Sequence, residues 1–330
     1  MDIKILFDNS EKPKKFNFFI GALGYESRCT AVARSLIKSN QVASGFYIPL
    51  RDDCSESYKD NRSFYDANSF HSLFTNNEFV ADESTTIKDI YAAIENKVNF
   101  LLKEGGINIA IDVSSLPRRL TAMVIRSIFK GCIKIDTFSI FYSPAKFSPP
   151  KQGFGPVAVS QPIIEEYAGW SMYPDRPPIA IIGLGYEYDR ALGVLDYLDV
   201  DIKRAVLMMP LSPDERYNAE VKKANKMLLS QVDNNQIVEY NVSSPEDSLI
   251  RLNAIISGLV RSNRVIVVPF GPKIFCSLSI LSSEILQNKD VTIWTVSGGK
   301  HEKPVDRKPS DFVYEIDLKC VSNEHNLHKA

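Results

Sequence analysis

The sequence predicts an α/β protein made of two tandem halves with mostly parallel, doubly wound sheets. Three observations support this fold class. A four-residue motif occurs twice, short apolar runs alternate with helix-like stretches, and the two halves follow the same order of elements. The 330 residues of the chain suffice for about two domains of ordinary size, each with its own hydrophobic core.

The internal repeat is the clearest of these observations. Leu23-Gly24-Tyr25-Glu26 returns as Leu184-Gly185-Tyr186-Glu187, and Ile48-Pro49-Leu50 is matched by Met209-Pro210-Leu211 at the same spacing of 161 residues. Two matches in one register indicate an internal duplication. We refer to residues 23–26 and 184–187 as the first and second LGYE turns.

Around these turns, each half repeats a strand, turn and helix pattern. Short continuous apolar runs are typical of parallel strands buried on both faces, and their alternation with helices predicts right-handed crossovers. Each half is therefore expected to be Rossmann-like, and the halves to be related by a pseudo-twofold axis. The expected strands are 16–21, 45–50, 107–113 and 135–142, then 179–183, 205–211, 264–270 and 291–296; the expected helices are 28–38, 87–103 and one from Pro117, then 190–197, 213–231, 247–261 and one from Pro272.

The remaining segments define the expected domain organisation. The first half covers residues 1–142 and contains an irregular insertion at 51–84, which is rich in Asp, Ser and Asn. Residues 143–178 contain many prolines, which indicates a linker or arm. The second half covers residues 179–330 and ends in a polar tail with one strand-like run.

Composition narrows the class of protein. A net charge of −1 supplies no general field for polyanions, which argues against general DNA binding. The five cysteines are far apart and contain no C-x-x-C pair, so neither a disulfide framework nor a zinc site is indicated. The sequence shows no signal-peptide pattern and no apolar run of membrane-spanning length, so a cytoplasmic protein without a membrane segment is expected.

Ligands of open parallel sheets bind beyond the carboxyl ends of the strands, where the strand order reverses. In each half an LGYE turn and one later turn are expected at such ends. The later turns are residues 112–119 (DVSSLPRR) and 269–273 (PFGPK), which we call the first and second Pro-cation turns because Pro117-Arg118 in one matches Pro272-Lys273 in the other.

The cations of these turns suggest an anionic ligand. A cation in the first turn of a helix opposes the helix dipole unless an anion lies between it and the backbone amides. Arg118, Arg119 and Lys273 are therefore predicted to hold a phosphate or a carboxylate. The alternative is that they extend into solvent or pair with acidic side chains.

The LGYE turns allow two interpretations. Their glycines are expected to provide positive φ or close backbone approach. Their glutamates either accept a hydrogen bond from a ribose hydroxyl or base amine, or cap the following helix with Arg28 and Arg190 as ion-pair partners. Their tyrosines either stack on a base of the ligand or cover the hydrophobic core. The predicted ligand-binding residues are Gly24, Tyr25, Glu26, Arg28, Asp112, Ser114, Ser115, Arg118, Arg119, Gly185, Tyr186, Glu187, Arg190, Gly271 and Lys273.

Catalytic motifs are scarce. The four histidines lie outside these turns, and the sequence contains neither a Walker A motif nor H-E-x-x-H, so no metal, cofactor or Ser-His-Asp triad is expected. The candidate catalytic residues are Ser114, Ser115 and Glu26. A serine pair before a helix is also a common cap.

Residues 21–28 with 112–119, and 183–190 with 269–273, resemble the CRISPR-associated Rossmann-fold (CARF) sensors and their tandem relatives, the SAVED domains. These families recognise cyclic oligonucleotide second messengers of antiviral defence, commonly across a pair of such folds. The resemblance implies a nucleotide or cyclic-oligonucleotide sensor, with a separate effector protein as partner. The second Pro-cation turn departs from the pattern because it lacks the acidic and hydroxyl residues of the first.

Two other functions stay open at this point. One is a metal-independent enzyme that cleaves a phosphodiester or N-glycosidic bond of a nucleotide, with Ser114 or Ser115, Arg118 and Glu26. The other is an adaptor subunit of a defence complex that binds no ligand. A final prediction concerns geometry: the four turns face one shared cleft, which brings Arg118, Arg119 and Lys273 close together.

Overall fold

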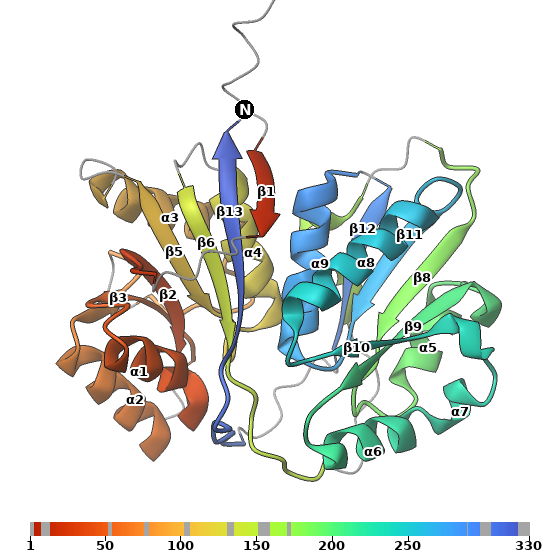
Figure 1. Ribbon diagram of the computed structural model, residues 1–330, viewed down its shortest axis with the longest axis horizontal. Helices are drawn as coiled ribbons and strands as arrows, with labels where there is room; N and C mark the ends of the chain where they lie inside the picture. Colours follow the sequence, from red (N-terminus) through yellow and green to blue (C-terminus); the bar gives the residue numbers. More distant parts are fainter. Residues whose placement is uncertain are drawn as a thin grey trace, which may run out of the picture. The chain divides into compact units, whose positions relative to one another are not determined.

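The computed structural model describes residues 3–7, 14–51, 55–75, 79–101, 106–130, 135–150, 159–169, 173–288, 290–297 and 305–322. The chain forms two compact units, one of Met1–Lys146 with Lys303–Ala330 and one of Phe147–Glu302. Each unit contains a mostly parallel sheet with helices on both faces (Figure 1). The predicted α/β, Rossmann-like fold class is confirmed.

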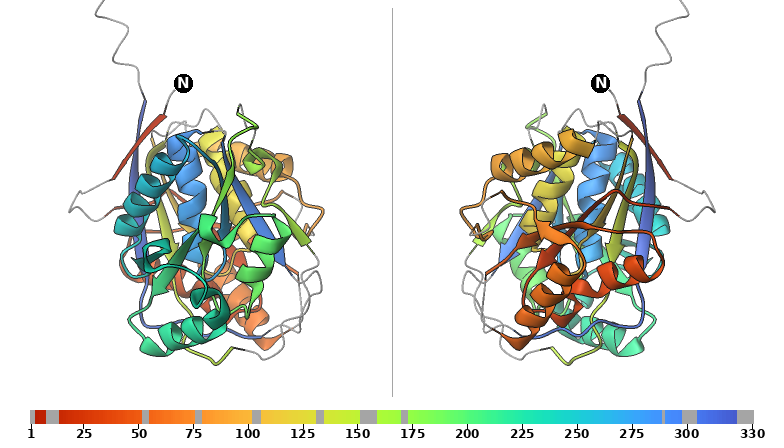
Figure 2. Two further views of the ribbon diagram at one scale, coloured as in Figure 1. Left: turned by 90° about the vertical axis from the view of Figure 1, so that its right-hand side faces the viewer. Right: turned by 90° about the vertical axis from the view of Figure 1, so that its left-hand side faces the viewer.

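The sheet of the first unit has the strand order β1-β13-β6-β5-β2-β3-β4 in the residues described. Strands β6 to β4 of this order are parallel, whereas β13 runs antiparallel to both β6 and β1. In Figure 2 the blue strand β13 lies beside the red strand β1. The elements are β1 (Ile3–Phe7), β2 (Phe18–Leu23), the 3-10 helix η1 (Ser27–Thr30), α1 (Ala31–Lys38), β3 (Gly45–Pro49), α2 (Glu56–Ala67), β4 (Phe70–Ser72), α3 (Ile87–Leu101), β5 (Ile107–Asp112), α4 (Arg118–Lys130), β6 (Ile135–Tyr142) and β13 (Tyr314–Ser322).

The sheet of the second unit has the order β10-β9-β8-β11-β12-β7, with β7 antiparallel to β12 and the other pairs parallel. Its elements are β7 (Val159–Pro162), η3 (Glu165–Tyr167), β8 (Pro178–Gly183), α5 (Arg190–Tyr197), η4 (Ile202–Arg204), β9 (Ala205–Leu211), α6 (Glu215–Ala224), α7 (Lys226–Leu229), η5 (Asn234–Gln236), β10 (Ile237–Asn241), α8 (Pro245–Leu259), β11 (Arg264–Pro269), α9 (Lys273–Leu286) and β12 (Val291–Ser297).

The two sheets share one topology. The order β4-β3-β2-β5-β6 of the first unit matches β10-β9-β8-β11-β12 of the second, and each sheet continues with an antiparallel strand beside its fifth parallel one. The duplication inferred from the LGYE repeat therefore extends over the parallel strands of both units. In each sheet the strand order reverses between the first and fourth parallel strands, that is between β2 and β5 and between β8 and β11.

The expected domain organisation needs three corrections. The segment 51–84 is not an irregular insertion, because it contains α2 and the parallel strand β4. The segment 143–178 is more than a linker, because β7 within it pairs with β12. The tail does not belong to the second half, because β13 forms backbone pairs with β6 and buries the alternating residues Ile316 and Leu318 in the first unit.

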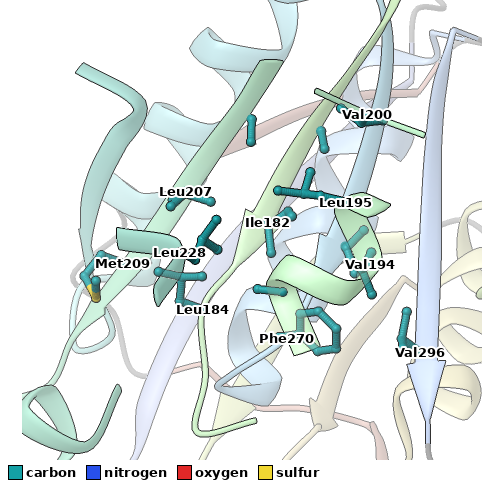
Figure 3. Packing of buried hydrophobic residues seen from close by; sticks show 14 of the residues in the cluster. Ile182, Leu184, Val194, Leu195, Val200, Leu207, Met209, Leu228, Phe270 and Val296 are labelled. Carbon is teal, nitrogen blue, oxygen red and sulfur yellow. The ribbon is translucent and has the colours of Figure 1, made fainter. Parts of the chain in front are cut away.

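The second LGYE turn and the second Pro-cation turn are both anchored in the hydrophobic core of the second unit. Leu184 of the LGYE turn is fully buried, and Phe270 of the Pro-cation turn is nearly so. Figure 3 shows both side chains among those of β8, α5 and β9, including Ile182, Val194 and Leu207. Burial of these apolar side chains fixes the start of each turn, so the residues that follow are presented at the carboxyl end of the sheet.

Among the helices of the described residues, none has the combined length and apolar character needed to cross a membrane.

Candidate functional site

The first candidate site lies at the carboxyl ends of β2 and β5. These strands are hydrogen-bonded neighbours, and the first LGYE turn follows one while the first Pro-cation turn follows the other. The side chains of the two turns also meet, because Ser115 Oγ donates a hydrogen bond to Glu26 Oε2 at 3.1 Å. The sequence-based prediction that these two turns lie together in the first half is confirmed.

Glu26 forms an ion pair within its own turn. Arg28 Nε donates to Glu26 Oε2 at 2.8 Å, and Arg28 Nη1 donates to the carbonyl of Ser143 at 3.3 Å. Arg28 is buried, and burial lowers the pKa of its guanidinium. The charge of Glu26, its hydrogen bond and the charges of Tyr142 and Asp112 together outweigh this effect, so the pKa is raised overall. The Glu26 side chain does not cap η1. Of the predicted alternatives for Glu26, the structure shows the local ion pair.

Asp112 and Ser114 support the Pro-cation turn from inside. Both are buried; Asp112 Oδ1 accepts a hydrogen bond from the Ser114 amide at 2.9 Å, and Ser114 Oγ accepts one from the Ser143 amide at 2.7 Å. These bonds connect the end of β5 to the end of β6. Ser114 as a catalytic group or ligand contact stays a prediction; in the structure its hydroxyl is buried and bonded to the backbone. Ser115 is the serine of this turn that contacts Glu26.

The two arginines of the first Pro-cation turn have different neighbours. Helix α4 begins at Arg118, with Pro117 just before it, and the Pro117 carbonyl accepts from the Thr121 amide. Arg119 Nη1 donates to the backbone carbonyl of Glu83 at 3.2 Å, which is not the predicted pairing with an acidic side chain. Burial raises the pKa of the Tyr142 phenol, and the charges of Arg28 and Arg118 oppose that increase. The charge of Arg118 therefore acts on the end of β6, where Tyr142 lies.

An asparagine that the sequence analysis missed holds the LGYE turn in each unit. Asn61 Nδ2, from α2, donates to the carbonyls of Gly24 and Glu26, both at 2.9 Å. Asn225, between α6 and α7, donates to the carbonyl of Gly185 at 2.8 Å. Both asparagines are buried and both follow the second parallel strand of their unit. Their spacing is close to the repeat register, but Asn61 lies in the segment that was interpreted as irregular.

The chain's own C-terminal segment covers the first LGYE turn. Asp306 accepts hydrogen bonds from the amide and the hydroxyl of Ser27, each at 2.6 Å. The amide of Arg28 donates to the carbonyl of Arg307 at 3.1 Å. Backbone and side-chain donors next to the first LGYE turn are thus bonded to a carboxylate and a carbonyl of the same unit. No local sequence pattern indicated this contact.

The second candidate site lies at the carboxyl ends of the paired strands β8 and β11. The second LGYE turn and the second Pro-cation turn approach each other through their glycines. A Cβ on Gly185 would lie 2.6 Å from the amide nitrogen of Gly271, and a Cβ on Gly271, whose φ is +73°, would collide with the carbonyl of Leu184. The expectation of close backbone approach is confirmed for Gly185. A Cβ on Gly24 would instead meet the Leu50 side chain at 3.2 Å.

The acidic side chain of this second turn differs from its counterpart. Glu187 is half-buried, and its Oε2 atom is buried without a hydrogen-bond partner among the described residues. This oxygen lies where a side chain on Gly185 would begin. Asp189 follows with a left-handed φ of 54°, and Arg190 begins α5.

Tyr186 packs in an aromatic cluster. Its ring stacks on Tyr217, with centroids 5.7 Å apart and planes 13° from parallel, and Tyr217 meets Phe147 edge-on at 5.1 Å. The guanidinium of Arg216 lies 4.8 Å from the Phe147 ring centroid and pairs with Asp214. On the other side of the second site, α9 begins at Lys273, and Pro272 before it offers no side-chain cap to the first backbone amides. Tyr25 is half-buried, and its carbonyl accepts from Ser57 Oγ.

In the part of the chain that is described, no group of three or more His, Cys, Asp or Glu side chains is arranged to hold a metal ion.

Comparison with known proteins gives no family for this chain. No family model matches it, and no curated protein matches it. Among solved structures, the UDP-GlcNAc 2-epimerase from Neisseria meningitidis bound to UDP-GlcNAc is 11% identical, with 76% of each chain covered and a TM-score of 0.24. A likeness this low carries no argument about function, so function is argued from the two sites.

Proposed function

We propose that this chain binds a nucleotide or cyclic oligonucleotide and acts as a sensor in antiviral defence signalling. The observation that supports the proposal is the position of the paired turns. In each unit the LGYE turn and the Pro-cation turn follow neighbouring parallel strands at the point where the strand order reverses. Doubly wound folds bind their ligands at this point. The resemblance of the same turns to those of CARF and SAVED sensors specifies the ligand class.

The phosphate groups of the ligand are assigned to the Pro-cation turns. Helices α4 and α9 are long enough to present a positive N-terminal end, and each begins with a cation, Arg118 or Lys273. Backbone amides and a cationic side chain together bind phosphate well, because the charge-assisted hydrogen bonds add to the helix dipole. The sugar and base are assigned to the LGYE turns, where Tyr25 and Tyr186 offer aromatic rings.

Thermal unfolding with a ligand panel tests this proposal. The panel contains adenosine mono- and triphosphate, ADP-ribose, and cyclic di-, tri- and tetra-adenylate. A ligand at a hundred times its dissociation constant should stabilise the protein by about 2.7 kcal/mol. If no member of the panel raises the unfolding temperature, the proposal is refuted.

Matched variants localise the effect. Arg118→Ala and Lys273→Ala are expected to weaken binding by about 10- to 100-fold, as for the loss of one charge-assisted hydrogen bond. Lys130→Ala removes an exposed cation at the opposite end of α4 from Arg118, and Lys203→Ala removes one in η4. Both variants should leave binding unchanged. Equal effects of all four variants would mean a non-specific charge effect.

The shared cleft stays a prediction that calorimetry can test. If both units contact one ligand, titration should give one ligand per chain, and Arg118→Ala and Lys273→Ala should weaken the same binding event. Two independent binding events per chain, each sensitive to only one of the variants, would argue against a shared cleft.

The hydrogen bond from Ser115 to Glu26 keeps a metal-independent cleaving enzyme as the second candidate. A carboxylate that accepts a serine proton is a general base, but the ion pair with Arg28 stabilises the charged form of Glu26 and makes it a weak one. Mass spectrometry of the bound nucleotide after long incubation with excess protein separates the two functions. Intact nucleotide supports the sensor, whereas cleavage that is lost in Ser115→Ala supports the enzyme.

A further inference from the structure

The two copies of the LGYE turn use the same glutamate differently. Glu26 Oε2 accepts from Arg28 at 2.8 Å and from Ser115 at 3.1 Å. Glu187 Oε2 is a buried atom and has no hydrogen-bond partner in the described structure. A carboxylate oxygen can only accept hydrogen bonds, and burying one without a donor is unfavourable. The second turn therefore holds an acceptor that the protein itself does not satisfy.

The sequence explains why the partners are missing. Two residues after the glutamate, the first turn has Arg28 and the second has Asp189. Two residues before the proline of the Pro-cation turn, the first has Ser115 and the second has Phe270, which is buried in the core. Both donors that satisfy Glu26 have thus been replaced by residues that cannot donate through their side chains. The loss of both donors leaves the acceptor of the second turn open.

The position of the open acceptor suits a ligand. Glu187 Oε2 lies over the Cα of Gly185, because a Cβ there would collide with it. The same Cβ position is 2.6 Å from the amide nitrogen of Gly271 in the second Pro-cation turn. The oxygen therefore lies where the two turns meet, at the carboxyl ends of β8 and β11. Gly271, on the other side of this meeting point, comes two residues before the start of α9 at Lys273.

The first turn is closed by comparison. Its glutamate is held by Arg28 and Ser115, and the donors of Ser27 are bonded to Asp306 of the C-terminal segment. An internal carboxylate already fills the place next to this turn. Among the described residues, no side-chain acceptor of the first LGYE turn is buried without a hydrogen-bond partner.

We propose that the duplicated turns have diverged, so that Glu187 binds an O–H or N–H donor of the ligand while Glu26 is a structural ion-pair partner. This inference rests on the proposed nucleotide-binding function and assigns an orientation to the bound nucleotide. The second unit recognises the donor groups of the nucleotide, which are the sugar hydroxyls or the amine of the base, next to the phosphate at Lys273.

Isosteric Glu→Gln substitutions in the two turns test the proposal. Glu187→Gln removes an unsatisfied charge, so the free protein should unfold at a higher denaturant concentration than wild type. The same variant should bind adenosine monophosphate about tenfold more weakly, as for the loss of one hydrogen bond to a charged group. Glu26→Gln breaks an ion pair, so it should unfold at a lower denaturant concentration than wild type. Glu239→Gln, an exposed glutamate of β10, is the neutral control.

Nucleotide analogues identify the donor. The 2′-deoxy analogue lacks one ribose hydroxyl, and inosine monophosphate lacks the amine of the base. The analogue that lacks the donor should bind the wild-type protein about as weakly as adenosine monophosphate binds Glu187→Gln. The affinity of that analogue for Glu187→Gln should be little lower than its affinity for the wild-type protein. This non-additivity would show that the missing group and Glu187 belong to the same hydrogen bond.

The outcomes separate this inference from the function on which it rests. Wild type that binds adenosine monophosphate, with unchanged affinity in Glu187→Gln, overturns the inference and leaves the proposed function standing. A Glu187→Gln protein as destabilised as Glu26→Gln also overturns it, because the carboxylate would then be satisfied in the free protein. Wild type that binds no nucleotide overturns the proposed function, and the inference falls with it.

Discussion

Replacement of Asn61 by alanine tests how the first LGYE turn is held in place. The Asn61 amide donates to the carbonyls of Gly24 and Glu26, both at 2.9 Å, and the side chain is buried. Each buried carbonyl left without a donor costs about 1 to 2 kcal/mol, so Asn61→Ala should destabilise the protein by about 3 kcal/mol. Asn225→Ala frees one turn carbonyl, that of Gly185, and should cost about half as much.

Guanidinium unfolding followed by circular dichroism measures both effects, with the free energy taken from linear extrapolation. Asn68→Ala is the matched control. Asn68 follows the same helix, α2, and its amide donates to the carbonyl of Phe64 within that helix, so its loss should cost less than about 1 kcal/mol. If Asn61→Ala is no more destabilising than Asn68→Ala, the buried asparagine does not hold the turn, and the parallel drawn between Asn61 and Asn225 has no energetic basis.

Three further changes test other parts of the two sites. Gly271→Ala places a Cβ at a φ of +73° against the second LGYE turn and should destabilise the protein by more than about 2 kcal/mol. The control Gly193→Ala lies in open space on α5 and should stabilise the protein by about 0.5 to 1 kcal/mol. Equal effects of the two variants in thermal unfolding would contradict the close packing of the two turns. Arg28→Gln leaves Glu26 without its ion-pair partner and should cost about 3 kcal/mol, and wild-type stability would show that the pair is not structural. Burial raises the pKa of the Cys29 thiol to about 12 from 9.0. The contribution of this thiol to the free energy of unfolding is therefore complete below pH 9 and falls as the pH rises toward 12, by up to about 1.4 kcal/mol per pH unit. Cys29→Ser should make the free energy of unfolding decline less steeply between about pH 9 and 11, and an unchanged slope would refute this.

Apart from β4 and β10, which were missed, the parallel strands were predictable from the sequence because they are apolar runs that bury both faces. The run before the first LGYE turn became β2 and the run before the second became β8, within two residues of the expected bounds at each end. Helix α2 was missed because most of its residues are polar, and its buried face consists of Tyr58, Asn61 and Tyr65. A narrow buried stripe of this kind gives a weak helical signal.

Long-range pairing limited the rest of the fold prediction. Strand β13 joins the first sheet from the far end of the chain, next to β6. Its local pattern predicts a strand but contains no information about which sheet it joins. The assignment of the tail to the second half followed chain order, and the backbone pairing is what overrides it.

The candidate site was predictable to the level of turns and no further. The repeat located both LGYE turns, and the helix-start pattern located Arg118 and Lys273. The partners of those turns come from distant segments, as Asn61 and Asp306 do, and no local spacing reveals them. The different states of the two glutamates depend on such partners, which explains why identical LGYE motifs gave identical predictions.

Hydrogen–deuterium exchange with the nucleotide that most stabilises the protein is the most direct test of the proposed binding site. Binding should slow exchange at residues 184–190 and 270–275, and at the start of α4 around Arg118, while the β1–β13 edge of the first sheet keeps its exchange rates. Protection confined to other segments, or none at a ligand concentration that saturates binding, would contradict the assignment of function to the paired turns.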